Sequence, residues 1–265
     1  KSREANKLVE EFMLFANKKV ATFISKKQNF PSVYRVHDKP DEEKLYNFKK
    51  TIETLGYVFK PKSNKTNVTI NNLLKECNGK KEQNLIETLA LRSMSKAEYT
   101  TENIGHYGLA FSNYTHFTSP IRRYPDIITH RLLHACLTKG KRENNEVLKE
   151  ACKHSSYREQ LATKAERDSI KYMQMVYMEN KIGEEFKAVI SGVTERGLYV
   201  EIIENKCEGM IKLTDMISDF YHFDLQNHLF RGINTNKTYQ LGDPMLVKVK
   251  KVNIQKGFLD FLPVE

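Results

Sequence analysis

Two adjacent arginines, Arg122 and Arg123, are the side chains of this sequence best suited to binding phosphate. They lie between Pro120 and Pro125, and the two prolines restrict the backbone around them. A guanidinium group presents a planar fork of donors that matches two phosphate oxygens, and a fork on a stiff turn loses little freedom on binding. The pattern therefore predicts a phosphate clamp. The alternative interpretation of Arg122 is an arginine that caps a helix or forms an ion pair.

The residues around this pair predict a loop that leads into a helix. From His106 to Ser119 the sequence is dense in Gly, Ser, Thr and His, which is typical of irregular structure. From Asp126 to about Leu137 the apolar residues recur at helical spacing. Binding residues are often found on loops that a rigid element positions, so this junction is the first place to look for a site.

The stretch from His106 to Arg131, HYGLAFSNYTHFTSPIRRYPDIITHR, closely resembles the late signature of the RNB catalytic domain. That domain belongs to the ribonuclease II and ribonuclease R family of processive 3′-to-5′ exoribonucleases. Three further segments are similar to the same family, in the same order: Leu8–Ala21, Tyr34–Leu45 and Lys164–Met178. The PIRRYPD form favours the ribonuclease R type over the ribonuclease II type. Together these segments cover most of residues 1–180.

The resemblance implies a function and a set of site residues. It implies part of an enzyme that degrades single-stranded RNA from its 3′ end to nucleoside 5′-monophosphates by Mg²⁺-assisted hydrolysis. Arg122 would have the catalytic role, at the phosphates of the RNA 3′ end. The implied substrate contacts in this part of the chain are Glu10, Arg123, Tyr124 and Glu166.

Glu10 also has a plainer interpretation. The segment around it has the apolar spacing of an amphipathic helix, with Leu8, Phe12 and Phe15 expected to face inward. An acidic residue on such a helix is usually part of the solvated face. The residue pattern alone leaves both interpretations open.

The metal ligands of the family are not recognisable in this sequence. The family holds Mg²⁺ with an aspartate cluster early in the catalytic domain, and here no three aspartates fall within one short motif. The sequence also begins at Lys1, inside a helical pattern. We therefore expect a C-terminal fragment that is inactive alone, with Mg²⁺ bound outside this chain. The alternative is a non-catalytic RNA-binding protein with a degenerate RNB domain.

The charge of the chain is unevenly distributed. The formal net charge is +10 over 265 residues, but residues 181–265 contain eleven Lys and Arg against twelve Asp and Glu. The basic excess therefore lies before residue 181, where counterion release from a polyanion would favour binding. A generally lysine-rich proteome would give the same excess. The sequence does not separate RNA from DNA as the ligand.

The cysteines and the apolar runs indicate a cellular location. The four cysteines are far apart and form no C-x-x-C pair, which predicts buried thiols in a reducing compartment; they are Cys77, Cys136, Cys152 and Cys207. No apolar run approaches the length of a membrane span. We expect a cytoplasmic monomer whose partner is single-stranded RNA, with no membrane contact.

The hydrophobic periodicity predicts an α+β fold with two domains. Residues 1–180 would form the mainly helical C-terminal part of an RNB domain, with helices over 2–24, 41–55, 68–76, 83–94, 126–137 and 146–180. Residues 181–265 would form an OB-fold RNA-binding domain, because five short alternating runs follow one another between glycine turns. The expected strands are 186–193, 197–203, 209–213, 245–252 and 257–262.

The β-rich part also resembles an RNA-binding domain of the ribosomal-protein-S-one type. The resemblance implies that Tyr199 stacks on a base and that three lysines contact the RNA backbone: Lys212, Lys248 and Lys250. Arg196 stands where that pattern usually has an aromatic residue.

The segment from Leu213 to Asp243 is rich in aromatic residues and is similar to a longer loop of the same family. A second interpretation is that its aromatic residues cap the barrel. The residues concerned are Tyr221, Phe223 and Phe230.

Overall fold

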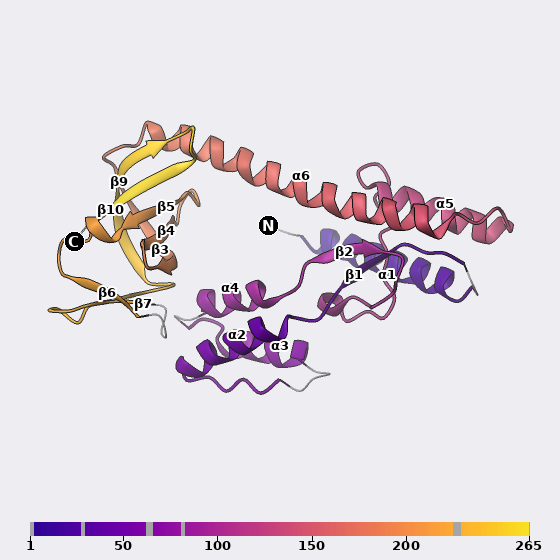
Figure 1. Ribbon diagram of the computed structural model, residues 1–265, viewed down its shortest axis with the longest axis horizontal. Helices are drawn as coiled ribbons and strands as arrows, with labels where there is room; N and C mark the ends of the chain where they lie inside the picture. The colour runs from indigo at the N-terminus through magenta and orange to yellow at the C-terminus, as the bar shows by residue number, and fades with distance from the viewer. Residues whose placement is uncertain (1–2, 28–29, 62–65, 81–82, 225–228, 265) are drawn as a thin grey trace. The chain divides into compact units, whose positions relative to one another are not determined.

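The structure is a computed structural model that describes residues 3–27, 30–61, 66–80, 83–224 and 229–264. It contains two compact units, and each unit is built from two stretches of the chain. The first unit comprises Lys1–Glu42 and Met94–Thr163, and the second comprises Glu43–Ser93 and Lys164–Glu265. Helices precede a β-barrel along the chain, so the fold is α+β, as the sequence predicts (Figure 1).

The first unit is a small sheet with helices. Its elements are α1 (Glu4–Ser25), β1 (Tyr34–His37), β2 (Ala97–Thr100), the 3₁₀ turn η1 (Tyr107–Leu109), α5 (Tyr124–Thr138) and the first part of α6 (Asn145–Glu179). The two strands are antiparallel, with Tyr34 opposite Thr100 and His37 opposite Ala97. The helices were expected from the sequence, whereas the two strands were not.

The core of this unit is made where α1, α5 and α6 meet. Its buried members are Ile24, Val33, Tyr99, Ile128, Leu132, Leu148 and Cys152. The buried face of α1 consists of Asn17, Ala21 and Ile24, four and three residues apart, which is the spacing of one helix face.

The expectation that the apolar residues in the first half of α1 face inward is wrong. Leu8, Phe12 and Phe15 are 60%, 66% and 59% exposed. Periodicity predicted an apolar stripe correctly, but among the described residues only the second half of α1 packs against other elements and is buried.

The second unit contains three short helices, the rest of α6 and all remaining strands. The helices are α2 (Glu42–Thr54), α3 (Thr66–Glu76) and α4 (Gln83–Ser93). Their apolar stripes provide the buried residues Phe48, Ile52, Ile70, Leu73 and Ile86. Phe48 also meets the buried Phe59 edge to face, with 5.1 Å between ring centroids.

Five strands of this unit close into a barrel. In chain order they are β3 (Glu185–Thr194), β4 (Gly197–Ile202), β5 (Glu208–Lys212), β9 (Pro244–Asn253) and β10 (Phe258–Val264). Around the barrel the order is β10-β5-β4-β3-β9, and β10 pairs with β5 in parallel, at Asp260 and Met210. All five strands overlap the runs predicted from the sequence. Met175 and Met178 of α6 belong to the barrel's buried core.

The segment between β5 and β9 forms a three-stranded sheet that the sequence did not predict. Its strands are β6 (Tyr221–Asp224), β7 (Leu229–Gly232) and β8 (Thr238–Gln240). Tyr221 and Phe230 are buried in the same cluster as the barrel core, and Phe223 packs against it. The interpretation of these aromatic residues as a cap on the barrel is therefore confirmed.

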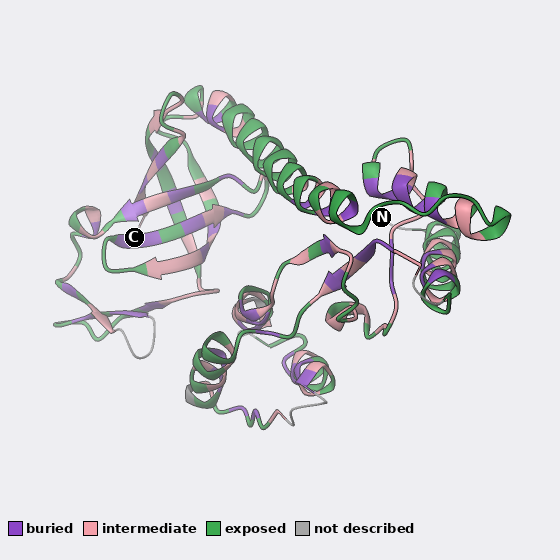
Figure 2. Ribbon diagram, turned by 45° about the vertical axis from the view of Figure 1, so that its right-hand side comes forward, coloured by how far each residue is buried: buried purple, intermediate pink, exposed green. Residues whose placement is uncertain are grey.

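Helix α6 is exposed over its middle, and Figure 2 shows this exposure along much of its length. Every residue from 160 to 173 is exposed. Among the described helices, none combines the length and the apolar character needed to cross a membrane. Cys77, Cys152 and Cys207 are buried free thiols, but Cys136 is only half-buried, so the prediction of four buried thiols is wrong at that position.

Candidate functional site

The loop before the arginine pair is held in place by a histidine from β1. The ring of His37 lies between two backbone groups, because its Nε2 is 2.7 Å from the carbonyl oxygen of Ser95 and its Nδ1 accepts from the N–H of Gly108 at 2.8 Å. This arrangement places the ring proton on Nε2. A Cβ at Gly108 would lie 2.9 Å from His37 Nδ1, so a larger residue here would have to displace the imidazole ring. The loop is therefore fixed by its backbone contacts.

A group of two buried tyrosines and two half-buried histidines lies behind the loop. The Tyr99 hydroxyl is 2.8 Å from Nδ1 of His116, and Tyr114 meets both His106 and His116 edge to face. Burial, which is the largest cause, and the neighbouring Arg123 together lower the pKa of His116 to about 3. Burial and the neighbouring His37 lower the pKa of His106 to about 4. Both rings are therefore neutral at pH 7.

These two histidines should make the fold sensitive to acid. Their folded pKa values lie below the ordinary value of 6.5, so between pH 6.5 and about 3 the unfolded chain binds protons that the folded chain excludes. The free energy of unfolding should be fully retained above pH 6.5 and should fall progressively below it. Denaturant titrations at several pH values should give a shallower pH slope for His116→Gln. The exposed His154→Gln should keep the parental slope, and an unchanged slope in His116→Gln would contradict the assignment.

Asn17 connects α1 to the loop. Its side chain is 3% exposed, its Nδ2 donates to the Tyr114 hydroxyl at 3.2 Å, and its Oδ1 accepts from the Phe117 N–H at 2.9 Å. Asparagine is a poor helix former, so its position on the buried face of α1 reflects these contacts. The segment just before the arginine pair is thus tied to the first helix.

The turn that carries the arginines is closed by Asp126. The N–H groups of Arg122 and Arg123 both donate to the carbonyl oxygen of Ser119, at 3.3 and 3.1 Å. Oδ2 of Asp126 accepts from the Ser119 N–H at 2.7 Å and from Nη2 of Arg123 at 2.8 Å. Asp126 is fully buried in the first turn of α5, where a negative charge is favourable. One carboxylate therefore fixes both ends of the turn.

The two arginines consequently differ in how free their guanidinium groups are to bind a ligand. Arg123 is ion-paired and its side chain is only 21% exposed. Arg122 is exposed, forms no ion pair with a described carboxylate, and lies 3.4 Å from the Ser119 hydroxyl. The ion-paired interpretation that was considered for Arg122 applies instead to its neighbour. Ile121 and Tyr124, on either side of the pair, are also exposed.

The two predicted acidic contacts remain predictions. Glu10 is exposed on α1, seven residues before Asn17, and it lines a shallow depression with Ala5, Asn6, Val9 and Met13. Among the described residues, no hydrogen bond or ion pair joins Glu10 to the turn. Glu166 is exposed on α6 and belongs to the second unit.

The barrel places Tyr199 and Lys212 on its outer surface. Tyr199 is 39% exposed on β4, opposite Met210 of β5, and Lys212 lies two residues further along β5 on the same face. Lys212 is ion-paired with Asp260 at 2.8 Å, and Lys250 with Asp215 at 2.7 Å.

Lys248 differs from the other two lysines. It is exposed, and no described carboxylate pairs with it. It is therefore the most available of the three predicted backbone contacts.

Sequence reasoning missed Asn17, His116 and the role of Asp126. Two signals could have indicated them. Asn17 shares a helix face with Ala21 and Ile24, where a polar residue needs a partner. Asp126 follows Arg123 by three residues, a spacing that allows an ion pair across the first helical turn.

The described residues do not fit a metal centre. They contain no group of three or more His, Cys, Asp or Glu side chains that could hold an ion. The chemistry available at the turn is therefore the binding and orientation of an anion by a guanidinium group.

Two family models match the chain. Residues 1–139 match the RNB domain, and residues 179–261 match the S1 RNA binding domain. Ribonuclease R of Aquifex aeolicus is 40% identical over 265 residues, which are 98% of this chain and 37% of that protein. Ribonuclease R of Escherichia coli is 34% identical over 271 residues, covering 97% of this chain and 33% of that protein.

The comparison with solved structures agrees with these matches. The apo form of Mycoplasma genitalium RNase R has a TM-score of 0.88 and 28% identity, and the match covers 100% of this chain and 42% of that one. The complex of that protein with ribose methylated single-stranded RNA also gives 0.88, at 27% identity and the same coverage. Yeast Ssd1, a pseudonuclease, shares the fold at a TM-score of 0.71 and 24% identity over 85% of this chain and 29% of that one. The chain spans about two fifths or less of the length of these relatives.

Proposed function

The chain belongs to the RNB-domain family, and from this membership we propose that it forms the C-terminal part of a ribonuclease R-type 3′-to-5′ exoribonuclease. The whole enzyme would degrade single-stranded RNA to nucleoside 5′-monophosphates. The observation that carries the proposal is the presentation of Arg122 on a turn whose two ends are held by one buried carboxylate.

The role proposed for Arg122 is to bind and orient phosphate. Phosphoryl transfer depends mainly on positioning and on compensating the charge of the phosphoryl oxygens. An exposed guanidinium fork on a fixed turn offers both, because its donors are already aimed and little side-chain freedom is lost. Arg123, held by Asp126, would keep the turn in shape and contribute positive potential. Glu10, Tyr124 and Glu166 are proposed contacts for the terminal nucleotides.

Mg²⁺, on which the family depends, is proposed to bind outside this chain. The described residues offer no suitable cluster, so no step of the reaction is assigned to the ion here. The binding of RNA by the S1-like barrel is a separate proposal, supported by the exposed Tyr199 and by Lys248, an exposed lysine that no described carboxylate pairs with.

We expect the 265-residue chain alone, supplied with Mg²⁺, to leave a labelled 3′-tailed RNA intact. The full-length protein that contains it should shorten the same RNA from the 3′ end, as seen by gel electrophoresis. Metal-dependent shortening by the chain alone would overturn the assignment of the metal ligands. A full-length protein that binds this RNA without shortening it would support the non-catalytic alternative.

Tyr199 should provide much of the RNA affinity of the barrel. Stacking on an aromatic side chain contributes on the order of 1–3 kcal/mol per base, so Tyr199→Ala should weaken single-stranded RNA binding by a corresponding amount. Fluorescence anisotropy of the whole chain with an oligoribonucleotide measures this loss. Tyr172→Ala, at an exposed tyrosine of α6, provides the matched control. Equal effects of the two substitutions would show that the RNA contacts another face.

A further inference from the structure

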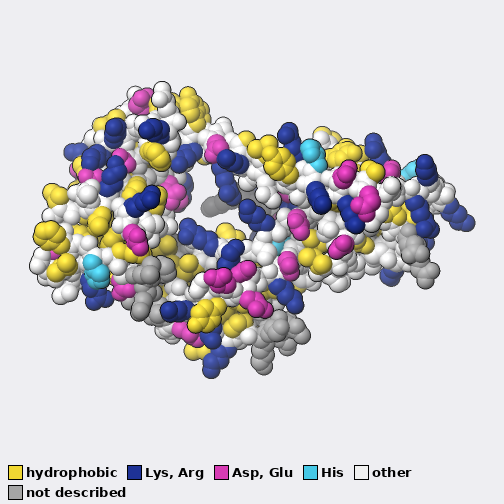
Figure 3. Space-filling model, viewed as in Figure 1, with side chains coloured by type: hydrophobic (Ala, Val, Ile, Leu, Met, Phe, Trp, Pro, Cys, Tyr) yellow, Lys and Arg dark blue, Asp and Glu magenta, His cyan; other side chains and the backbone are white. Residues whose placement is uncertain are grey.

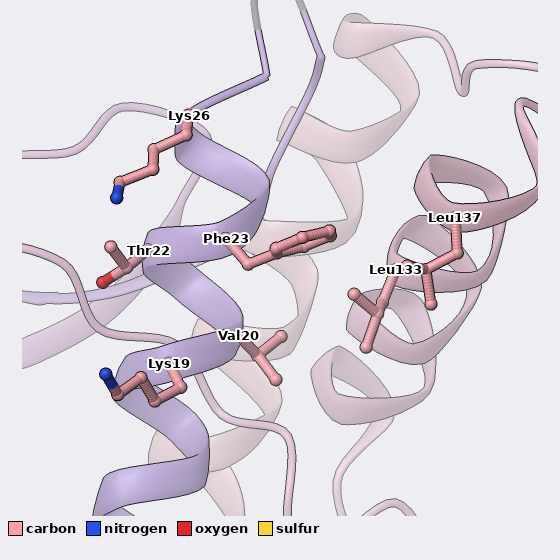
Figure 4. Close-up of a pocket in the computed structure, with 7 residues that line it drawn as sticks. All are labelled: Lys19, Val20, Thr22, Phe23, Lys26, Leu133 and Leu137. Atoms are coloured by element: carbon pink, nitrogen blue, oxygen red, sulfur yellow. The ribbon is translucent and has the colours of Figure 1, made fainter.

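A groove between α1 and α5 is a surface of the first unit that the proposed function leaves unused. It consists of two neighbouring depressions of about 470 and 430 Å³ that share Phe23 and Leu137. Figure 4 shows Val20 and Phe23 pointing from α1 toward α5, with Leu133 and Leu137 facing them across the gap. The facing walls of the first depression are therefore apolar and come from two helices, whereas the second depression is also lined by polar residues outside them.

The outer part of the groove is exposed to water. Val20 and Leu133 pack on the core beneath, whereas Phe23 is 39% exposed and Leu137 is 63% exposed. Phe23 and Leu137 are therefore not part of the hydrophobic core of the first unit. They border the groove with apolar surface that is exposed to water.

The charge around the groove has one sign. Lys19 and Lys26 line the first depression, and the second is lined by Lys27, Lys139 and Arg142. In Figure 4, Lys19 and Lys26 leave α1 on the side turned away from α5, so they lie outside the gap between the two helices, on the far side of α1.

The two stretches of sequence that line the groove contain no acidic residue. Residues 12–37 and 127–142 contain no Asp or Glu. In Figure 3 the end of the first unit, at the right of the view, carries several Lys and Arg side chains. The groove therefore has an apolar interior with a cationic surround, which is complementary to an acidic ligand with apolar side chains.

The aromatic rings of the groove are poorly placed for stacking on bases. Lys27 Nζ lies 5.3 Å from the centroid of the Phe23 ring, and the guanidinium carbon of Arg142 lies 5.8 Å from that of Phe30. Each ring thus has a cation over one face, and the other apolar walls are aliphatic. Single-stranded nucleic acid relies on free ring faces for affinity. These observations favour a protein ligand over RNA.

We propose that this groove binds an acidic segment of a partner protein. Apolar side chains of the segment would fill the space between Phe23 and Leu137, and its carboxylates would face the surrounding lysines. This is the arrangement by which apolar grooves between helices capture amphipathic peptides, with charge at the rim selecting the partner. The proposal does not depend on the role of Arg122, because the two sites share no residue.

A displayed library of random peptides, selected on the immobilised whole chain at physiological ionic strength, tests the proposal. We expect the enriched peptides to combine Asp or Glu with Leu, Ile or Phe. Leu137→Ser should weaken binding of an enriched synthetic peptide by about tenfold, the loss typical of removing a central apolar contact. Lys139→Glu, at a lysine that lines the second depression beside Leu137, should weaken it by a similar factor. Both positions are exposed, so the fold should be retained.

Matched controls are available on the same chain. Leu91→Ser changes a leucine that is 76% exposed on α4, and Lys153→Glu reverses an exposed lysine of α6. Neither should alter peptide affinity. The proposal is overturned if no peptide is enriched, if the enriched peptides are basic or uncharged, or if Leu137→Ser and Leu91→Ser behave alike. It is also overturned if Leu137→Ser instead abolishes binding to an oligoribonucleotide or to phosphatidylglycerol vesicles.

Discussion

Replacing Arg122 by alanine in the full-length protein should slow the proposed RNA cleavage by roughly 100- to 1000-fold. Losing one charge contact to the transition state commonly costs about 2.7–4 kcal/mol, and Arg122 is the exposed member of the pair on the fixed turn. Affinity for long RNA should fall much less, because many other contacts share it. Single-turnover cleavage of a labelled RNA measures the first quantity, and filter binding measures the second.

The geometry of the arginine fork provides a further check on this result. Arg122→Lys keeps the charge but loses the planar pair of donors, so it should also be impaired. Arg158→Ala, at an exposed arginine of α6, should cleave at the parental rate. A parental single-turnover rate in Arg122→Ala would assign this residue a structural role only.

Replacing Asp126 by alanine should destabilise the chain by about 3–5 kcal/mol, the cost of leaving one member of a buried ion pair without its partner. The substitution removes the acceptor for the Ser119 N–H and for Arg123, and the carboxylate is fully buried. Denaturant unfolding of the whole chain, followed by circular dichroism, gives the change in the free energy of unfolding.

Two variants make this measurement specific. Asp126→Asn keeps an oxygen acceptor but loses the charge, so its loss of stability should be smaller than that of alanine. Asp38→Ala, at an exposed carboxylate outside the core, should change stability by less than about 0.5 kcal/mol. Equal values for Asp126→Ala and Asp38→Ala would show that the turn is held by other contacts.

The helices and barrel strands were predictable because their signals are local. The apolar stripe of α2 begins just after Pro40 and ends before Gly56, so periodicity and chain breakers agree on it. The strands β1 and β2 are four residues each, too short for a reliable alternation, and each is stabilised by a partner far away in the sequence. No local pattern indicates such a pairing.

The site was predictable in its location and less so in its details. The arginine pair was identified from residue type and the flanking prolines, but sequence alone treats Arg122 and Arg123 as near equivalents. Asp126 separates them, because a carboxylate three residues after Arg123 captures that side chain and leaves its neighbour exposed. Burial and hydrogen bonding decide which arginine can bind a ligand, and both depend on the folded chain.

The way β1 and β2 are joined has a consequence for how the chain is made. Residues 34–37 pair with residues 97–100, and α2, α3 and α4 lie between them in the sequence. During synthesis β1 therefore cannot pair with β2 until the three intervening helices and β2 itself have left the ribosome. Closing so long a loop is entropically costly and slows folding. Helices that fold early within the loop shorten its effective span, so substitutions that unfold them should delay formation of the first unit.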